Sequence, residues 1–521
     1  MNTRKITRWI GVLCALAVLS CEYASAQKAT VSSDLEFHAS DEQLNQAFTW
    51  AKQQALDYAR PATSPIGEWY EAALPGRNAF CMRDVSHQTT GAAALGLFPA
   101  NRNMLGRFAD AVAPSRNWAG YWEIDGEGNP STADYVSDSD FWYNLPANFD
   151  VLDAIVRMWR WTGDNSYRDD PRIQAFFRET MTNYISQWQL APDDILKRPR
   201  IANQRQAEGK FVHSRGIPSY TEGPKDFIFG ADLLAAEYRA MRSYKEIAVS
   251  SQDKVLAARL QKTAEQIQQR LETVAWSDTG KHFNGVIRKN LSGFGSGDAM
   301  ALYFDAVKDP AHIQGALAYL SDPAYWKQIN IEEESYVPLI LFRYGRTAAA
   351  YRVLFDLASP DKQRREYPEV SYAVIDAIVR GTMGIEPSHA GDAYDVQTLP
   401  QPLTNNETMK VSSLRIRGNL LDIASHGATT IDFSNRQGLS IRWKAAFKGD
   451  VAVLYANGHA VPAKHGALPG GTRTSWITIT VSPGSSAVVS EIKQYAQHSC
   501  VLHDQRRAHS HYSHWVRQCS T

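Results

Sequence analysis

Residues 68–88 combine side-chain types that acid–base chemistry uses. Arg83, Asp84, Ser86 and His87 come together at the start of a predicted helix, whose N-terminus favours anions. Asp84 and His87 are three residues apart and therefore share one helix face. An imidazole with its usual pKa of about 6.5 is neutral at pH 7 and can accept a proton. The alternative is that Asp84 caps the helix and His87 is a buried structural residue.

Three further polar clusters also precede predicted helices and combine carboxylates, amides, cations and aromatic rings. In chain order their members are Asp138, Asp140, Trp142, Tyr143 and Asn144, then His213, Arg215, Tyr220, Glu222 and Lys225, then Glu332, Glu333 and Glu334. Stacking rings beside polar groups are typical of a carbohydrate pocket. Each cluster also has a structural explanation, because helix caps, hydrophobic staples and dipole complements use the same residue types.

The elements that position these clusters are predicted to be helical from about residue 41 to residue 385. Hydrophobic spacing predicts twelve helices, most of them joined by short turns. They cover residues 41–60, 83–97, 101–113, 144–163, 169–190, 224–249, 251–275, 296–307, 310–321, 335–344, 345–358 and 370–383. Six antiparallel hairpins form an (α/α)6 toroid, and no repeat of fixed period indicates an open solenoid. Loops entering the inner helices of a toroid gather at one rim, so the four clusters should converge.

The predicted fold is therefore mainly α, with an (α/α)6 catalytic domain at residues 27–393. Its long connections at 61–82, 114–143, 191–223 and 276–295 are expected to carry function. After residue 393 the apolar period becomes two, as at Ile441 and Trp443, which predicts a small antiparallel β-sandwich at 394–495. Residues 496–521 are rich in histidine without ligand spacing and are predicted to be a disordered tail.

The first 26 residues have the pattern of a signal peptide. A basic start is followed by a short apolar run at 10–19 and by the small residues Ala24-Ser25-Ala26. Lipid attachment at Cys21 is the competing interpretation, but Leu19 fits that signal poorly. We therefore expect an exported protein in the periplasm or outside the cell.

The composition of the chain indicates which classes of binding partner are expected. The chain has 521 residues with 55 basic and 55 acidic side chains, so its formal net charge is zero. Without a basic field, nucleic acid is not an expected partner. No segment after the signal reaches the ~18 apolar residues of a membrane span. No cluster has metal-ligand spacing, so no metal and no cofactor are predicted.

Residues 79–88, Ala-Phe-Cys-Met-Arg-Asp-Val-Ser-His-Gln, together with 140–144, Asp-Phe-Trp-Tyr-Asn, resemble polysaccharide lyase family 27 within the six-hairpin glycosidase-like superfamily. The resemblance covers about residues 30–495. It implies an exo-acting, metal-independent lyase that cleaves L-rhamnose-α-1,4-D-glucuronate in plant arabinogalactan. It also implies a triad-like base centred on a histidine, which matches His87 here. The implied partner is a glucuronate-containing oligo- or polysaccharide.

Elimination from a glucuronate removes the C5 proton and expels the oxygen at C4, on the same side of the ring. The sugar carboxylate must be neutralised during this step. The candidates for that role are Arg83, Arg215 and Lys225. For protonation of the leaving oxygen they are Tyr143 and Tyr220, and for orientation of the imidazole Glu222 and Asp138. Further substrate contacts are expected from Asp84, Asp140, Trp142 and Asn144.

Two other functions fit the same residues. A glycoside hydrolase needs two carboxylates, about 5–5.5 Å apart if retaining and about 6.5–9.5 Å apart if inverting. Asp84, Asp140, Glu222 and Glu333 can supply such a pair. A non-catalytic glycan-binding protein needs the aromatic rings but no base. The products separate the three functions: an unsaturated uronate, a saturated sugar, or none.

Overall fold

The computed structural model describes residues 31–199, 211, 214–221 and 227–493. The predicted signal peptide, the predicted tail, Cys21, Glu222 and Lys225 lie outside the described residues. Export therefore stays a prediction. Among the described helices, none is both long enough and apolar enough to cross a membrane.

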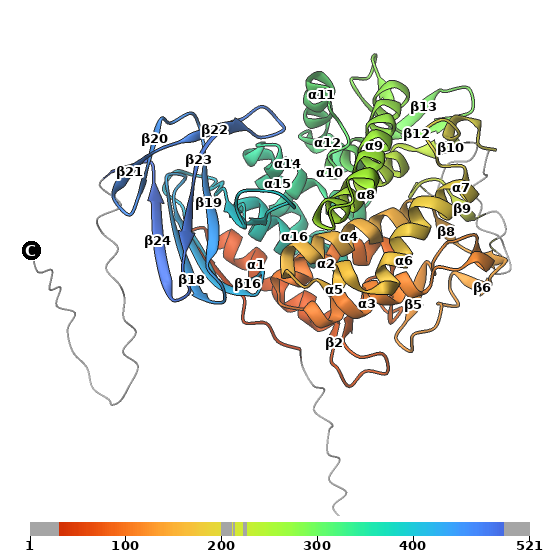
Figure 1. Cartoon of the computed structure of the whole chain (residues 1–521), viewed down its shortest axis with the longest axis horizontal. Helices are drawn as coiled ribbons and strands as arrows, with labels where there is room; N and C mark the ends of the chain where they lie inside the picture. Colours follow the sequence, from red (N-terminus) through yellow and green to blue (C-terminus); the bar gives the residue numbers. More distant parts are fainter. Residues whose placement is uncertain (1–30, 200–210, 212–213, 222–226, 494–521) are drawn as a thin grey trace, which may run out of the picture.

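Six inner helices contact one another in a closed ring at the centre of the helical region (Figure 1). They are α2 Met82–Ala94, α4 Pro146–Thr162, α8 Ala231–Ser250, α10 Asp298–Tyr303, α14 Val337–Arg343 and α16 Pro368–Asp376. The π-helical segment Ala377–Thr382 continues α16 and contacts α14. Nearly every residue of α2 and α4 is buried, as expected for helices surrounded by other helices.

Outer helices cover this ring and are amphipathic. They are α1 Glu42–Tyr58, α3 Phe98–Asp110, α6 Pro171–Glu179, α9 Lys254–Val274, α11 Pro310–Leu320 and α15 Thr347–Ala358. In α9, Leu260, Ala264, Ile267 and Leu271 are buried at helical spacing. Shorter segments complete the helical region: the 3₁₀ turns Pro114–Arg116 and Ile195–Lys197, α5 Ser166–Asp169, the π-helical Thr180–Tyr184, α7 Ile185–Trp188, α12 Pro323–Trp326 and α13 Ile331–Glu334.

Two sheets form the β region at one side of the molecule (Figure 1). The first has the order β1 Glu36–Ala39, β16 Thr408–Ile416, β17 Asn419–His426, β18 Thr430–Gln437, β24 Ser485–Ser490, β20 Val453–Ala456 and β21 His459–Pro462. The second has the order β14 Glu386–Pro387, β15 Val396–Thr398, β19 Ile441–Lys448, β23 Arg473–Val481 and β22 Lys464–Ala467. Buried residues alternate with exposed ones along most of β16 and with half-buried ones along most of β17. Phe433 of β18 stacks on Trp443 of β19 with ring centroids 4.7 Å apart.

The prediction of a mainly α fold is wrong, because 42% of the residues are helical and 24% are in strands. Twelve short strands lie in segments predicted mostly as loops or helix ends. They are β2 Ala59–Arg60, β3 Trp69–Tyr70, β4 Ala79–Cys81, β5 Glu123–Asp125, β6 Tyr135–Ser137, β7 Asp140–Phe141, β8 Tyr143–Asn144, β9 Arg215–Ile217, β10 Phe227–Gly230, β11 Trp276–Ser277, β12 His282–Arg288 and β13 Gly293–Ser296. Most have two to four residues, too few for a period of two to be recognised.

The β region also departs from a purely antiparallel arrangement, since β15 pairs with β19 in parallel. Its edge strand β1 comes from the start of the described chain and pairs with β16. Such long-range pairing leaves no local signal in the sequence. The division into domains at residue 393 stays a prediction.

Candidate active site

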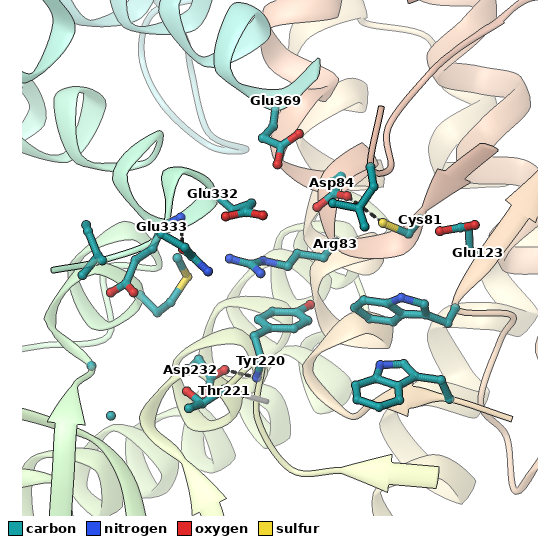
Figure 2. A pocket seen from close by; sticks show the side chains of 18 of the residues that line it. Cys81, Arg83, Asp84, Glu123, Tyr220, Thr221, Asp232, Glu332, Glu333 and Glu369 are labelled. Carbon is teal, nitrogen blue, oxygen red and sulfur yellow. Dashed lines mark hydrogen bonds between the residues drawn. The ribbon is translucent and has the colours of Figure 1, made fainter. Parts of the chain in front are cut away.

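A pocket of about 540 Å³ lies at the N-terminal ends of the inner helices (Figure 2). Its described lining contains seven carboxylates and two arginines. The carboxylates are Asp84, Glu123, Asp134, Asp232, Glu332, Glu333 and Glu369, and the arginines are Arg77 and Arg83. The lining includes members of all four predicted clusters, with Trp142 from the second and Tyr220 from the third. Side chains that are distant in sequence therefore meet at one rim of the ring.

Arg83 and Asp84 occupy the first turn of α2. The strand before this helix, β4, pairs with β5, and Cys81 at its end is the N-cap residue of α2. The Cys81 thiol donates to Asp84 Oδ2 at 2.7 Å. Burial, opposed by the nearby Arg83 guanidinium, raises the pKa of Asp84 to about 6. Asp84 therefore holds a proton in part near neutral pH, as a general acid must.

Glu332 and Glu369 face Asp84 across the pocket (Figure 2). Glu332 belongs to α13, just before α14, and Glu369 lies in the first turn of α16. Within the described chain, Glu332 Oε2 and Glu369 Oε2 are buried without a hydrogen-bond partner. Burial and the neighbouring Asp84 carboxyl hold the pKa of Glu369 well above its ordinary value. Asp84, Glu332 and Glu369, the acid cluster, are the pocket groups best placed to exchange protons with a ligand.

Other carboxylates in the lining are held by their neighbours. Arg77 Nη1 lies 2.8 Å from Glu123 Oε2 and 3.2 Å from Asp134 Oδ2 at the pocket edge. Glu333 Oε1 accepts a hydrogen bond from the Tyr325 hydroxyl at 2.7 Å. These interactions give Glu123, Asp134 and Glu333 structural roles in the pocket wall.

Strand pairing joins the second predicted cluster to the third, because β8 pairs with β9 in parallel. Asn144 donates from Nδ2 to the Ser219 carbonyl and accepts from Trp142 Nε1, both at 2.6 Å. It thereby fixes the Trp142 ring of the pocket wall and the loop that carries Tyr220. The Arg83 guanidinium lies over the Tyr220 ring, 4.7 Å from its centroid.

His87 is not part of the described pocket lining, and only 7% of its surface is exposed. Its ring stacks on Tyr336 at a centroid distance of 3.5 Å, and Nε2 lies 2.9 Å from Ser335 Oγ. Burial, together with the charges of Arg83 and Arg157, lowers the pKa of His87 well below its usual value. The imidazole is therefore neutral at pH 7. Its role as the base stays a prediction.

The remaining candidates lie outside the described lining or outside the described chain. Tyr143 is buried and donates to Asn148, and Asp140 accepts from the Phe211 amide. Asp138 contacts Arg116 and Tyr135, each at 2.6 Å, and Arg215 lies over the Phe141 ring. Hydrogen bonds from Ser115 and Tyr135 lower the pKa of Asp138 to about 2. His213, Glu222 and Lys225 fall outside the described residues.

Several acids of this site were not predicted from the sequence. Glu369 follows a helix-initiating proline and lies in the first turn of its helix, as Asp84 does, which is the signal that could have identified it. Glu123 and Asp134 lie in the long connection at 114–143 that was expected to carry function, yet neither was singled out. Asp232 lies in the first turn of α8, in a segment where the predicted helix began several residues too early.

Comparisons with known proteins concern the fold. The sequence matches no protein-family model and no curated protein. The structure is similar to an α-L-rhamnosidase from Dictyoglumus thermophilum, with a TM-score of 0.54 and 14% identity over 88% of this chain and 51% of that one. It is also similar to a GH78 rhamnosidase of Bacillus sp. GL1, with a TM-score of 0.52 and 13% identity over 78% of this chain and 41% of that one. The fold is glycosidase-like.

A third similar structure is a sialidase, with a TM-score of 0.51 and 10% identity over 77% of this chain and 40% of that one. The chain spans about half or less of the length of these enzymes. The similarity supports an (α/α)6 glycosidase-like architecture, as the superfamily resemblance implied. Membership of polysaccharide lyase family 27 stays a prediction. In the described part of the chain, no group of three or more His, Cys, Asp or Glu is arranged to hold a metal ion.

Proposed function

We propose that the protein is a glycoside hydrolase that cleaves a glycosidic bond at the acid cluster. The observation that carries this proposal is the meeting of three carboxyl groups from three helix starts, two of them with raised pKa values. Glycoside hydrolysis uses one carboxylic acid to protonate the leaving oxygen and a second carboxylate to activate water or to attack the sugar. The cluster contains both types of group.

The environments of the three groups support separate roles. Neighbouring buried carboxyls resist ionising together, so Asp84 and Glu369 retain a proton between them near neutral pH. We assign the role of proton donor to this pair, and within it Asp84 is the residue that gives the proton to the leaving oxygen. Glu332 is our candidate for the second carboxylate, because its Oε2 is buried without a hydrogen-bond partner in the described chain and can accept one from water. Arg83 orients the sugar between them.

The charge of the pocket lining affects which sugars it can bind. Seven carboxylates and two arginines line the described pocket, and Arg77 is already paired with Glu123 and Asp134. Such a pocket favours a sugar without a negative charge over a uronate. Two of the similar structures are rhamnosidases, so α-L-rhamnosides are the first substrates to test.

The rhamnose–glucuronate lyase predicted from the sequence is the second candidate. One observation favours it: Arg83 lies in the pocket over Tyr220, which pairs a cation for the uronate carboxylate with a phenol for the leaving oxygen. Against this, His87 lies outside the described lining.

A rhamnose-capped glucuronate oligosaccharide separates the candidates in one assay. Hydrolysis adds one water and yields rhamnose with a saturated glucuronate end. Elimination breaks C5–H and C4–O, forms a C4–C5 double bond, adds no water and gives an end that absorbs ultraviolet light. We expect saturated products from this oligosaccharide or from an aryl α-L-rhamnoside. An unsaturated uronate would establish the lyase instead, and binding without cleavage would establish a glycan-binding protein.

A further inference from the structure

Tyr220 is held at three points in the pocket wall. Its hydroxyl donates to Asp150 Oδ2, and its backbone amide donates to Asp232 Oδ2 at 2.5 Å. Its ring lies under the Arg83 guanidinium, as Figure 2 shows. The orientation of the ring therefore determines where Arg83 can rest.

Asp150 anchors this arrangement from outside the described pocket lining. It lies on the inner helix α4 with 4% of its surface exposed. Its Oδ1 has no hydrogen-bond partner in the described chain, so the Tyr220 hydroxyl is the interaction that this carboxyl makes there. Burying a carboxyl that makes a single hydrogen bond lowers the stability of the fold. Its presence is explained if its contact with that one partner has a function.

We propose that Asp150 is a positioning residue that fixes the Tyr220 ring and thereby the place where Arg83 meets the sugar. This inference rests on the proposed hydrolase function and adds a residue that does not touch the substrate. The helix carrying Asp150 is enclosed by other inner helices, so its backbone is a firm support for the contact. Displacement of a binding group by about 1 Å can reduce turnover by about 100-fold.

Three single variants and one double variant test the proposal through kcat and KM on the substrate that the wild-type enzyme cleaves. Asp150→Leu removes the acceptor and should reduce kcat/KM by about 10- to 100-fold. Asp150→Asn keeps an oxygen that accepts the Tyr220 hydroxyl and should remain within about threefold of wild type. Tyr220→Phe should match Asp150→Leu, and the double variant should be no worse than either, because both remove the same contact.

Tyr184→Phe is the matched control. It also deletes a buried tyrosine hydroxyl that bonds to the start of α4, through the Leu145 carbonyl at 2.7 Å, but it lies outside the described pocket lining. It should lower the melting temperature and leave kcat/KM per folded molecule unchanged. If Asp150→Leu behaves like this control, Asp150 has only a structural role and the inference fails.

Two other outcomes also decide the question. A much larger loss in Tyr220→Phe than in Asp150→Leu would place the phenol in direct contact with the substrate and overturn the proposal. Equal losses in Asp150→Asn and Asp150→Leu would do the same, because the acceptor would then not matter. Failure of the hydrolase function is seen separately, as absence of hydrolysis by the wild-type enzyme before any variant is compared.

Discussion

The two halves of the inner helices bury charged side chains in opposite ways. The N-terminal ends form the carboxylate-rich pocket, whereas the later turns surround a cavity of about 40 Å³ lined by five arginines, Arg157, Arg160, Arg239, Arg343 and Arg380. Asp153 in this arginine cavity accepts from Arg157 at 2.8 Å, Arg239 at 3.0 Å and Ser243 at 2.6 Å. Burial acts to raise its pKa, but the arginines outweigh burial and hold it well below its ordinary value.

The comparison shows that burial alone does not give a carboxyl its chemistry. Asp84 and Asp153 are both buried enough for desolvation to raise their pKa values, and partners alone reverse the outcome for Asp153. The placement also agrees with helix dipoles, which favour acids at N-termini and cations toward C-termini. The contacts of Asp153 stabilise the fold, whereas Glu332 and Glu369 in the pocket each keep an oxygen without a hydrogen-bond partner in the described chain.

The largest expected effect is on turnover at the pocket. Asp84→Asn and Glu332→Gln should each lower kcat by about 10²- to 10⁴-fold, because each removes a proton-transfer group. Neither should lower the melting temperature, since both replace a carboxyl by an amide of the same shape. Steady-state kinetics and thermal unfolding on one preparation test both statements. Full activity in either variant would remove that residue from its proposed role.

The arginine cavity should show the reverse behaviour. Asp153→Ala leaves Arg157 and Arg239 without their shared acceptor and should lower the free energy of unfolding by about 3–5 kcal/mol. Folded molecules should keep their kcat. Denaturant unfolding monitored by circular dichroism measures the free energy of unfolding. Activity per folded molecule measures kcat. An unchanged unfolding midpoint would contradict the structural role that the comparison gives to Asp153.

The sequence predicts these features unequally, for physical reasons. Helices such as α9 are recognisable because Leu260, Ala264, Ile267 and Leu271 repeat at the helical period. Arg83, Asp84 and Tyr220 were found because polar residues at helix starts stand out from the apolar pattern. Strands β8 and β9 could not be found, since two or three residues carry no period and their pairing spans some seventy residues of chain.

The residues that contact a side chain determine its role, and these contacts cannot be read from the sequence. His87 has the type and spacing of a base, yet its Nε2 lies against Ser335, far away in the chain. Asp150 and Asp153 lie three residues apart on α4, and nothing local distinguishes the one that meets Tyr220 from the one that meets arginines. Contacts between distant elements assign these roles.

Substitution of Cys81 should have a smaller effect, a shift in the pH dependence of activity. Its thiol donates to Asp84 and lowers the pKa of that carboxyl, opposing burial. Asp84 is active when protonated, so activity should fall as the pH rises through about 6. Cys81→Ala removes the donor, raises the pKa of Asp84 and should move this alkaline limb to higher pH. Cys81→Ser keeps a donor and is the control.

Stability should change with pH for the same reason. The pKa of Asp84 is raised from 3.8 to about 6 in the folded state, so its stabilising contribution is complete below 3.8 and is lost as the pH rises through about 6. Asp84→Asn cannot ionise, and its melting temperature relative to wild type should therefore increase across that window. A constant difference at all pH values would contradict the raised pKa.

A small effect on turnover is expected at His87, which lies on α2 between Asp84 of the pocket and Thr90 of the arginine cavity. His87→Ala removes the stack on Tyr336 and the contact with Ser335, and should lower the free energy of unfolding by about 1–3 kcal/mol. If the acid cluster carries the chemistry, kcat per folded molecule should stay within about threefold of wild type. Ser335→Ala keeps the stack but deletes the contact of the hydroxyl with His87 and its hydrogen bond to the Glu332 carbonyl, and should cost about 1–2 kcal/mol. A stable His87→Ala protein whose kcat falls by about 10²-fold or more would instead make the imidazole the base and favour the lyase.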